Sequence, residues 1–354
     1  MQKENMPPIN LAEENAVAKT DTPVVRMRTM VNALHTLHAI DVGVQMGFFR
    51  IIAQSAQPGS IDTFVKQTKF SEQYVIPWLR AMQSTGVIDI NNNNITIRPD
   101  WREVLTNEKS SDYMANLPAC HLAIVDGYRR VPEAFRNGTI FSPNEFSKEM
   151  VRAISSDSIR FTNLFIGKVL DALPELKEKL TNGATVYDVG CGGGLMSINL
   201  AEYFSRSTFI GIDVLPQAIE VAREEAIRLQ AGNNLSFRVM NATQLPTGKA
   251  DCVILNEVWH EIQPSQRLSA LKAIRGALKQ DGVLFVVEAL VPEDPNEYVK
   301  SEYRPAALCD FVEAPWGSKM PTRSEFNALL TEAGFGEPKY IQSSDVVFAA
   351  VVSP

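Results

Sequence analysis

A short apolar segment that runs directly into a glycine-rich loop constrains the fold of this chain most strongly. Residues 186–189 read Val-Tyr-Asp-Val, and positions 190–194 read Gly-Cys-Gly-Gly-Gly. Glycine adopts a positive φ without steric cost and has no Cβ, so such a loop forms a tight turn and offers bare backbone to a ligand. The segment therefore predicts a buried strand, a ligand-binding turn and a helix that starts near Leu195.

The glycine spacing distinguishes two kinds of nucleotide site. A dinucleotide-binding loop of the form G-x-G-x-x-G would have its last glycine at the position of Leu195. The next predicted strand, 208–213, ends in Asp213, and it lies 23 positions (213 − 190) after Gly190, the distance expected for a carboxylate that binds a ribose diol. Taken alone, Asp213 fits the N-cap of a helix at 217–230 better than a ligand group. Its spacing from the glycine loop favours a nucleoside ligand.

The composition is that of a globular protein long enough for two domains. The chain has 354 residues, of which 45% are hydrophobic and 21% charged. Its net charge of −7 argues against nucleic acid as the main partner, because that affinity depends on clustered Lys and Arg. The four cysteines are far apart and show no C-x-x-C spacing, which indicates reduced thiols and a cytoplasmic protein.

Neither a metal site nor a membrane segment is expected. The chain has only four histidines and no cysteine pattern typical of metal ligands. No apolar run reaches the roughly 20 residues that span a bilayer. Residues 1–22 are polar and acidic, so we expect a disordered tail and not a signal peptide.

Residues 23–108 are expected to form an α-helical winged-helix domain. Two short alternating segments, 87–90 and 95–97, are separated by four asparagines that suit a hairpin turn. They follow helical patterns at 29–42, 47–55, 61–68 and 71–85. The helix at 71–85 has one basic residue, Arg80, and is otherwise rich in apolar side chains, so it favours contact with protein over DNA reading. We expect a homodimer formed through the apolar helices at 29–55 and 71–85.

The remainder divides into a helical connector or lid at 109–180 and a catalytic domain at 181–354. In the catalytic domain strands and helices alternate, which predicts a parallel sheet covered on both faces. The expected strands lie near 185–189, 208–212, 235–239, 251–255 and 282–288. Two further strands, 339–342 and 346–352, follow one another directly and predict an antiparallel edge.

These features resemble the class I S-adenosylmethionine-dependent methyltransferases, and among them the small-molecule O-methyltransferases with an N-terminal winged-helix dimerisation domain. The resemblance covers about residues 25–352 and is most specific between 184 and 290. It implies an α/β fold with a Rossmann-like seven-stranded sheet, mostly parallel with an antiparallel last strand. It also implies S-adenosylmethionine as cofactor, with S-adenosylhomocysteine as its product.

The same resemblance implies a cofactor site. Asp188, Gly190 and Gly192 would line the amino-acid end of the cofactor. Asp213 would accept hydrogen bonds from both ribose hydroxyls. The adenosine end would be contacted by Asn241, which can bond the adenine amine, by Ala242, which stands where relatives pack a residue on the adenine, and by Asn256.

A general base is implied next to this site. His260 and Glu261 follow the fourth strand where the family has a His-Asp pair, and the histidine is the base in O-methylating relatives. Glu288, at the end of the fifth strand, matches an acid that orients the histidine. The second orienting glutamate of the plant enzymes falls at Met320, so this chain departs from the family pattern. A structural or substrate-orienting role for His260 remains the alternative.

The predicted function is methyl transfer from S-adenosylmethionine to a small-molecule acceptor, with a hydroxyl as the preferred acceptor, by in-line displacement in a pocket between connector and Rossmann-like domain. S-, N- or C-methylation is the alternative, including that of an acidic metabolite held by Arg129 and Arg130. A winged-helix regulator with a ligand-sensing domain is the alternative of another class. A nicotinamide-dependent oxidoreductase is disfavoured by the missing glycine at 195 and by the antiparallel tail.

Overall fold

The computed structural model describes residues 22–54, 59–343 and 348–354, which divide into two units between Thr106 and Asn107. The predicted disordered tail, residues 1–22, lies outside the described residues except for Thr22. In the described part of the chain, no helix is long and apolar enough to cross a membrane. The same part contains no group of three or more His, Cys, Asp or Glu side chains placed to hold a metal ion.

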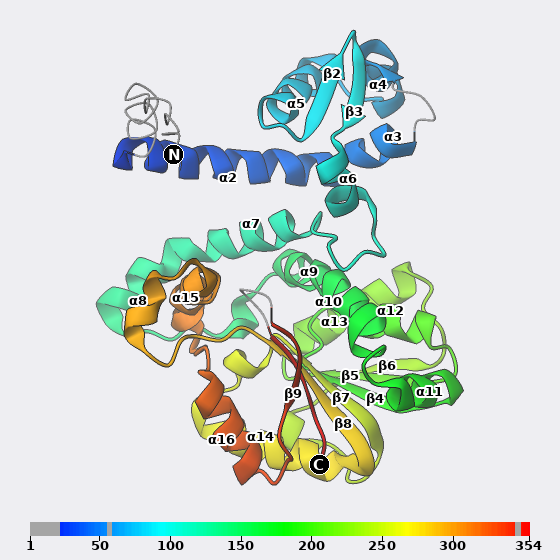
Figure 1. Cartoon of the computed structure of the whole chain (residues 1–354), viewed down its shortest axis with the longest axis vertical. Coiled ribbons are helices and arrows are strands. Elements are labelled where there is room, and N and C mark those ends of the chain that lie inside the picture. The colour runs from blue at the N-terminus through cyan, green and yellow to red at the C-terminus, as the bar shows by residue number, and fades with distance from the viewer. Residues whose placement is uncertain (1–21, 55–58, 344–347) are drawn as a thin grey trace, which may run out of the picture. The chain divides into compact units, whose positions relative to one another are not determined.

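The first unit combines helices with a small antiparallel sheet (Figure 1). Its elements are α2 (Pro23–Gln45), α3 (Phe48–Gln54), β1 (Gly59–Ser60), α4 (Ile61–Thr68), α5 (Glu72–Ser84), β2 (Ile88–Asn91), β3 (Asn94–Ile97) and α6 (Pro99–Thr106). The sheet order is β1-β3-β2. Trp78 of α5 packs edge-on against Phe48 and Phe49 of α3, which joins the helices around an aromatic core.

The predicted hairpin is confirmed, with a tighter turn than the four asparagines indicate. Asn91 and Asn94 pair with each other as strand residues. Asn92 and Asn93 form the turn with φ values of 49° and 67°. Asparagine tolerates this left-handed region better than most residues, which accounts for the choice of residue. The order of helices followed by a hairpin agrees with the winged-helix prediction, which itself remains a prediction.

Helix α2 starts earlier than the predicted 29–42 and leaves an apolar face open to solvent. The Thr22 side chain accepts a hydrogen bond from the Val25 backbone, and Pro23 occupies the first turn, so the helix begins at a regular N-cap. Six apolar side chains follow one face at three- and four-residue spacing and are between 39 and 65% exposed. They are Val24, Met27, Met30, Val31, Leu34 and Leu37.

The second unit begins with the helices that were predicted as a connector. They are α7 (Leu117–Gly127), η1 (Tyr128–Arg130), α8 (Val131–Asn137), η2 (Pro143–Glu145), α9 (Lys148–Ser156), α10 (Ser158–Leu164), η3 (Phe165–Val169) and α11 (Pro174–Asn182). They belong to the same compact unit as the large sheet that follows. Phe161, Phe165 and Leu180 of this region lie in a core shared with that sheet.

The large sheet has seven strands in the order β6-β5-β4-β7-β8-β10-β9. Its strands are β4 (Thr185–Val189), β5 (Thr208–Asp213), β6 (Leu235–Val239), β7 (Ala250–Asn256), β8 (Leu278–Glu288), β9 (Lys339–Ser343) and β10 (Phe348–Val352). Strands β4 to β8 are parallel, and β10 is antiparallel to both β8 and β9. The prediction of a mostly parallel seven-stranded sheet with an antiparallel last strand is confirmed.

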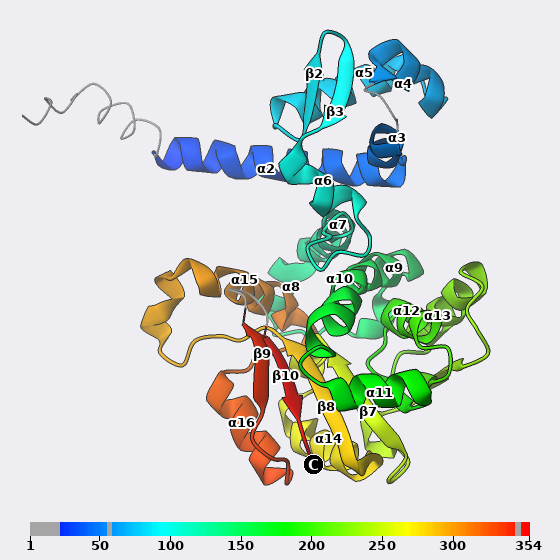
Figure 2. The ribbon, with the colours of Figure 1, turned by 45° about the vertical axis from the view of Figure 1, so that its right-hand side comes forward.

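Both faces of this sheet are covered by helices (Figures 1 and 2). The connecting helices are α12 (Leu195–Tyr203), α13 (Pro216–Arg228), η4 (Ala242–Gln244), η5 (Trp259–Glu261), α14 (Pro264–Ala277), α15 (Arg304–Glu313), η8 (Ala314–Trp316) and α16 (Arg323–Glu332); two short 3₁₀ turns, η6 (Pro295–Val299) and η7 (Ser301–Tyr303), precede α15. Helices α14 and α16 pack on one face, and α11 and α12 on the other. The strand order reverses at β4, which creates a crevice at the carboxyl ends of β4 and β7, the usual ligand site of such sheets.

Candidate active site

A cavity of about 680 Å³ opens at the carboxyl ends of β4, β5 and β7. This volume suits a small-molecule ligand or a cofactor together with its substrate. Every residue proposed from the sequence for the cofactor lines this one cavity: Asp188, Gly190, Gly192, Asp213, Asn241, Ala242 and Asn256. The structure thus brings together residues that lie up to 68 positions apart (256 − 188).

The glycine loop is fixed by close neighbours. Gly190 and Gly192 have φ values of 69° and 52°, in the left-handed region that favours glycine. A Cβ on Gly190 would lie 2.5 Å from the side chain of Val258, so no other residue fits there without movement. The backbone N–H of Gly193 donates to the Ser155 hydroxyl of α9 over 2.6 Å. Ser155 was not predicted, because it lies far from the loop in sequence and belongs to no motif.

Asp213 accepts a hydrogen bond from the glycine loop and also lines the cavity. Its two carboxylate oxygens accept hydrogen bonds from the backbone of Gly192 and of Leu215, each over 2.9 Å. Burial raises the pKa of this carboxyl, and the backbone donors oppose that rise. Because each carboxylate oxygen has two lone pairs, Asp213 retains acceptor capacity for the hydroxyl groups of a ligand.

Asp188 lies at the other end of the loop. Its carboxylate accepts a 2.6 Å hydrogen bond from the hydroxyl of Ser197 in the first turns of α12. Burial raises the pKa of Asp188 to about 6, against the effect of this hydrogen bond. A buried carboxylate of raised pKa at a cavity wall gains from a cationic ligand, because a positive charge nearby favours its ionised form.

Two amide side chains in the cavity wall, Asn241 and Asn256, are in different states. Asn241 caps η4, since its Oδ1 accepts from the backbone of Thr243 over 3.0 Å, and Ala242 is buried beside it. Asn256 has a buried Oδ1 atom that accepts no hydrogen bond within the described structure. Buried polar atoms are normally paired, so Asn256 is an acceptor that a ligand donor would satisfy.

His260 is held between two carboxylates. Its Nδ1 atom lies 2.8 Å from Glu288 Oε1 and its Nε2 atom 2.9 Å from Glu313 Oε2. The second Glu288 oxygen accepts the backbone N–H of His260 over 3.0 Å. Burial alone would lower the pKa of His260, but the two carboxylates outweigh it and raise the pKa well above 6.5. This arrangement favours the protonated imidazolium form of the ring.

Glu313 is the group that sequence reasoning missed. It ends α15, 53 positions after His260 (313 − 260), and no motif marks it. Its contact with the imidazolium lowers the pKa of Glu313, although burial acts in the opposite direction. Met320, where relatives have the second orienting glutamate, is buried in a small apolar cluster instead. Glu313 lines the cavity, whereas His260 lies behind it.

Two more acids, Glu257 and Glu261, line the cavity beside this group. Burial raises the pKa of Glu257 to about 7, and nearby Asp157 adds to the rise while Arg160 opposes it. Solvent reaches Glu261 inside the cavity, yet the surrounding protein atoms raise the pKa of its carboxyl to about 8. Glu261 was predicted as the partner of His260 in a catalytic pair. The His260 ring instead contacts Glu288 and Glu313.

A family model described as a methyltransferase domain matches residues 180–334. This stretch contains the glycine loop, Asp213, His260 and Glu288. The chain contains a methyltransferase domain. The recognition made from the sequence is thereby confirmed at the level of the domain.

Curated relatives resemble the methyltransferase domain over part of their length. Carboxy-S-adenosyl-L-methionine synthase of Desulfotalea psychrophila is 28% identical over 150 residues, which cover 42% of this chain and 61% of the relative. Ubiquinone biosynthesis O-methyltransferase of Actinobacillus pleuropneumoniae is 34% identical over 110 residues, which cover 29% and 44%. The chain therefore spans less than two thirds of the length of these relatives.

Solved structures resemble nearly the whole chain. Human N-acetylserotonin methyltransferase, crystallised in complex with SAM, superposes with a TM-score of 0.64 at 15% identity, and the match covers 94% of this chain and 98% of that one. At this identity the similarity establishes the fold. It agrees with the class I sheet order, and the family match supports S-adenosylmethionine as the cofactor of the methyltransferase domain.

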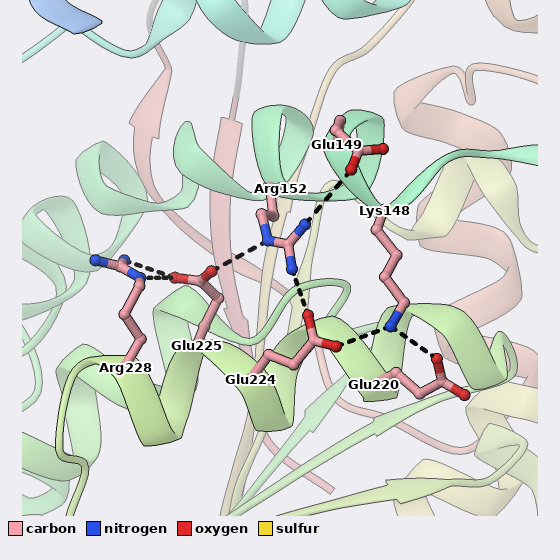
Figure 3. A network of polar contacts seen from close by, with 7 residues as sticks. All are labelled: Lys148, Glu149, Arg152, Glu220, Glu224, Glu225 and Arg228. Atoms are coloured by element: carbon pink, nitrogen blue, oxygen red, sulfur yellow. Dashed lines mark hydrogen bonds and ion pairs between the residues drawn. The ribbon is translucent and has the colours of Figure 1, made fainter. Parts of the chain in front are cut away.

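An ion-pair network attaches α9 to the methyltransferase domain (Figure 3). Lys148 of α9 lies 3.0 Å from Glu220 and 2.8 Å from Glu224 of α13. Arg152 pairs with Glu224 and lies 3.3 Å from Glu225. Ser155, one turn further along α9, is the residue that bonds the glycine loop. The network thus holds the helix whose Ser155 bonds the glycine loop.

We expect the His260 ring to remain protonated at about pH 7.5, above the ordinary histidine pKa of about 6.5. Because the pKa of His260 is higher in the folded than in the unfolded chain, its attraction to Glu288 and Glu313 contributes its full stabilisation below pH about 6.5. This contribution is lost only as the pH rises through the folded-state pKa of His260. Nitrogen-15 NMR of histidine-labelled protein measures this titration, with the signal assigned by its absence in His260→Asn.

The variant Glu313→Gln should lower the His260 pKa, because it removes one of the two carboxylates. Glu332→Gln, an exposed acid in α16, is the matched control and should leave the titration unchanged. A ring that is already neutral at pH 7 in the unmodified protein would contradict the arrangement.

Proposed function

We propose that this chain transfers a methyl group from S-adenosylmethionine to a hydroxyl of a small-molecule acceptor. The observation that carries the proposal is the single cavity that joins all seven predicted cofactor residues to the Glu288–His260–Glu313 group through Glu313. A small-molecule substrate agrees with the cavity volume of about 680 Å³. A cytoplasmic location and the absence of a nucleic-acid partner stay predictions.

The residues present fit the cofactor. Asn256 has an unpaired buried oxygen, Asp213 has free acceptor capacity, and the loop around Gly190 has no side chain that would block close approach. Asp188 would favour a cationic amino-acid end. When bound, the cofactor supplies a methyl group already activated by a sulfonium. The chain then has to hold the acceptor oxygen in line with that methyl group, about 3–3.5 Å away, and to exclude water.

The far wall of the cavity suits an apolar acceptor body. It consists largely of aliphatic and aromatic side chains from α9, α10, η8 and the segments before them. They include Phe141, Phe146, Ile154, Phe161 and Trp316. Phe141 and Phe146 both pack edge-on against Trp316, which fixes the orientation of these rings. Such a wall binds a flat or aliphatic molecule through burial of apolar surface.

Removal of the hydroxyl proton is assigned to the three residues Glu288, His260 and Glu313 acting together. Glu313 is their only member in the described cavity wall, so it is the point of contact with the acceptor proton. His260 acts through Glu313 as a positioning residue, and Glu288 holds it through one hydrogen bond to the ring and one from the His260 backbone N–H. A proton transferred from the acceptor to Glu313 neutralises its carboxylate. The positive charge of His260 is then balanced by the second carboxylate, Glu288.

The cofactor assignment predicts tight binding of S-adenosylhomocysteine that depends on Asp213. Calorimetric titration of the full chain should show one site, and Asp213→Ala should weaken binding by about 100-fold or more, since a buried carboxylate with hydroxyl partners is removed. NADH is the negative control ligand, and Glu332→Gln is the control variant. Binding of NADH instead, or no binding of the nucleoside, would refute the proposed function.

The proton-transfer assignment predicts a loss of turnover without loss of cofactor. With an acceptor found by screening phenols against methyl-labelled S-adenosylmethionine, Glu313→Gln and His260→Ala should each lower kcat by about 100-fold or more. Their affinity for S-adenosylhomocysteine should stay within about threefold of the unmodified protein. A change in the pH dependence of kcat in His260→Ala separates its role from a purely structural one. A loss of less than threefold in kcat would remove the assignment.

A homodimer is proposed from the apolar face of α2. Six neighbouring exposed apolar side chains on one helix face are more than a monomer usually leaves open, and a second copy of the same face is self-complementary by two-fold symmetry. All six side chains are uncharged, so a second copy of the face can bury them against each other.

Light scattering of the unmodified chain should therefore give twice the monomer mass of 39.2 kDa at micromolar concentration. The double variant Val31→Glu, Leu34→Glu should give the monomer mass, because it places charges at the centre of the apolar face. Asn32→Glu, about 160° from Leu34 around the helix at 100° per residue, is the control and should remain dimeric. A monomeric unmodified chain would exclude the dimer.

A further inference from the structure

The described wall of the cavity contains six carboxylates and no Lys, Arg or His side chain. The acids are Asp157, Asp188, Asp213, Glu257, Glu261 and Glu313. Four of them have protein partners inside the wall or directly behind it. Asp188 and Asp213 are bonded at the cofactor loop, and Glu313 contacts His260. Asp157 accepts hydrogen bonds from Arg160 through both oxygens, over 2.9 and 2.8 Å.

Glu257 and Glu261 differ from these four. No hydrogen bond or ion pair joins either carboxylate to another residue in the described part of the chain. Both line the cavity: Glu257 directly follows β7, and Glu261, four positions later, is the last residue of η5. Two carboxylates without a cationic partner on one wall make that wall electronegative, and the half-buried Glu257 also loses solvation there.

The turn holds Glu257 in a conformation that a glutamate rarely adopts. Its φ is 53°, and its backbone N–H donates to the carbonyl of Val287 over 2.8 Å. This hydrogen bond fixes the residue at the end of β7, so its side chain keeps its place in the wall. Strain of this kind is retained where the surrounding structure enforces it, and it is common at functional sites.

The charged groups around the pair leave its charge uncompensated. Glu257 faces Arg160 and Asp157 from α10 and its N-cap, Glu288 from β8 and His260 from η5; Glu261 faces His260, Glu313, Asp213 and Glu288. The guanidinium of Arg160 is engaged with Asp157 and stacks 4.0 Å over the ring of Phe161. The imidazolium of His260 is shared by Glu288 and Glu313. Arg160 and Asp157 offset each other, and the one positive charge of His260 already faces two carboxylates, so neither cation is left to neutralise Glu257 or Glu261.

We infer that Glu257 and Glu261 recognise a positively charged nitrogen on the acceptor, so that the substrate class is a hydroxylated cationic amine with an apolar body. The inference rests on the proposed function and adds to it the charge of the substrate. An ammonium group at this wall can form charge-assisted hydrogen bonds with carboxylates that no protein cation neutralises. The apolar wall around Phe161 and Trp316 receives the body of the molecule.

The alternative of an acidic acceptor does not fit this wall. It would need a cation, and Arg130, one of the two arginines considered for that role, pairs with Glu145 and lies 3.7 Å from Glu133. Arg130 also stacks 3.8 Å over the ring of Phe141. Phe141 lines the cavity, whereas Arg130 does not. An anion in the cavity would meet no cationic side chain among the described lining residues.

The test uses three phenols of similar size and different charge, titrated into the full chain saturated with S-adenosylhomocysteine. Tyramine is cationic, 4-ethylphenol neutral and 3-(4-hydroxyphenyl)propionate anionic. Tyramine should bind at least about tenfold more tightly than 4-ethylphenol, and the anion should bind most weakly. This preference should grow between about pH 6 and pH 8.5, because the two carboxyls become ionised in that range while the amine stays protonated.

The variant Glu257→Gln, Glu261→Gln keeps the size of both side chains and removes both charges. It should reduce the preference for tyramine to less than about threefold and leave affinity for S-adenosylhomocysteine unchanged, which also reports correct folding. Glu261→Gln alone should give an intermediate preference. Glu332→Gln is the control and should retain the full preference.

Three results would overturn the inference. The first is tyramine that binds no tighter than 4-ethylphenol, including no binding by either. The second is a preference that survives in the double variant. The third is a double variant that loses affinity for S-adenosylmethionine but not for S-adenosylhomocysteine, which would assign both acids to the sulfonium. A chain that fails to bind S-adenosylhomocysteine would instead refute the proposed function, so the two failures are distinguishable.

Discussion

The site depends on backbone hydrogen bonds that tie the glycine loop to the end of β5. The N–H groups of Gly190 and Cys191 both donate to the carbonyl of Ile212, over 2.8 and 3.0 Å, and Gly192 donates to the carboxylate of Asp213. These bonds need the left-handed backbone that glycine allows at positions 190 and 192. They fix the end of β5 relative to the glycine loop that follows β4. The cavity lies at this junction.

Burial requires the charged side chains around His260 to be paired. Glu288 is fully buried, and its two oxygens fix the ring and the backbone of His260. Glu313 closes the other side of the ring. A buried charge is tolerated only when it is paired, so these three residues must remain together. Glu257 and Glu261 lie outside this pairing, and desolvation by the surrounding protein raises the pKa of both carboxyls.

The sequence was informative where function follows from local order along the chain. Glycines at fixed spacing, an acid at the end of the next strand and alternating strands predicted the sheet and the cofactor side of the cavity. Ser155 and Glu313 escaped, because their roles depend on contacts over 38 and 53 positions, made by helices whose packing no local pattern encodes. The hairpin of the first unit was predicted from its asparagines, although pairing of Asn91 with Asn94 made its turn shorter than expected.

Helix α9 belongs to both halves of the cavity. Its Ser155 bonds the glycine loop, its neighbour Ile154 lies in the acceptor wall, and Lys148 and Arg152 anchor it to α13. Loop, helix and wall are therefore joined by direct contacts through α9. Under the proposed function, a substitution on α9 that changes the acceptor preference should also change the affinity for the cofactor. Segments that line the cavity but do not bond the glycine loop, such as η8 with Trp316, are the places where substitutions could change the acceptor without changing cofactor binding.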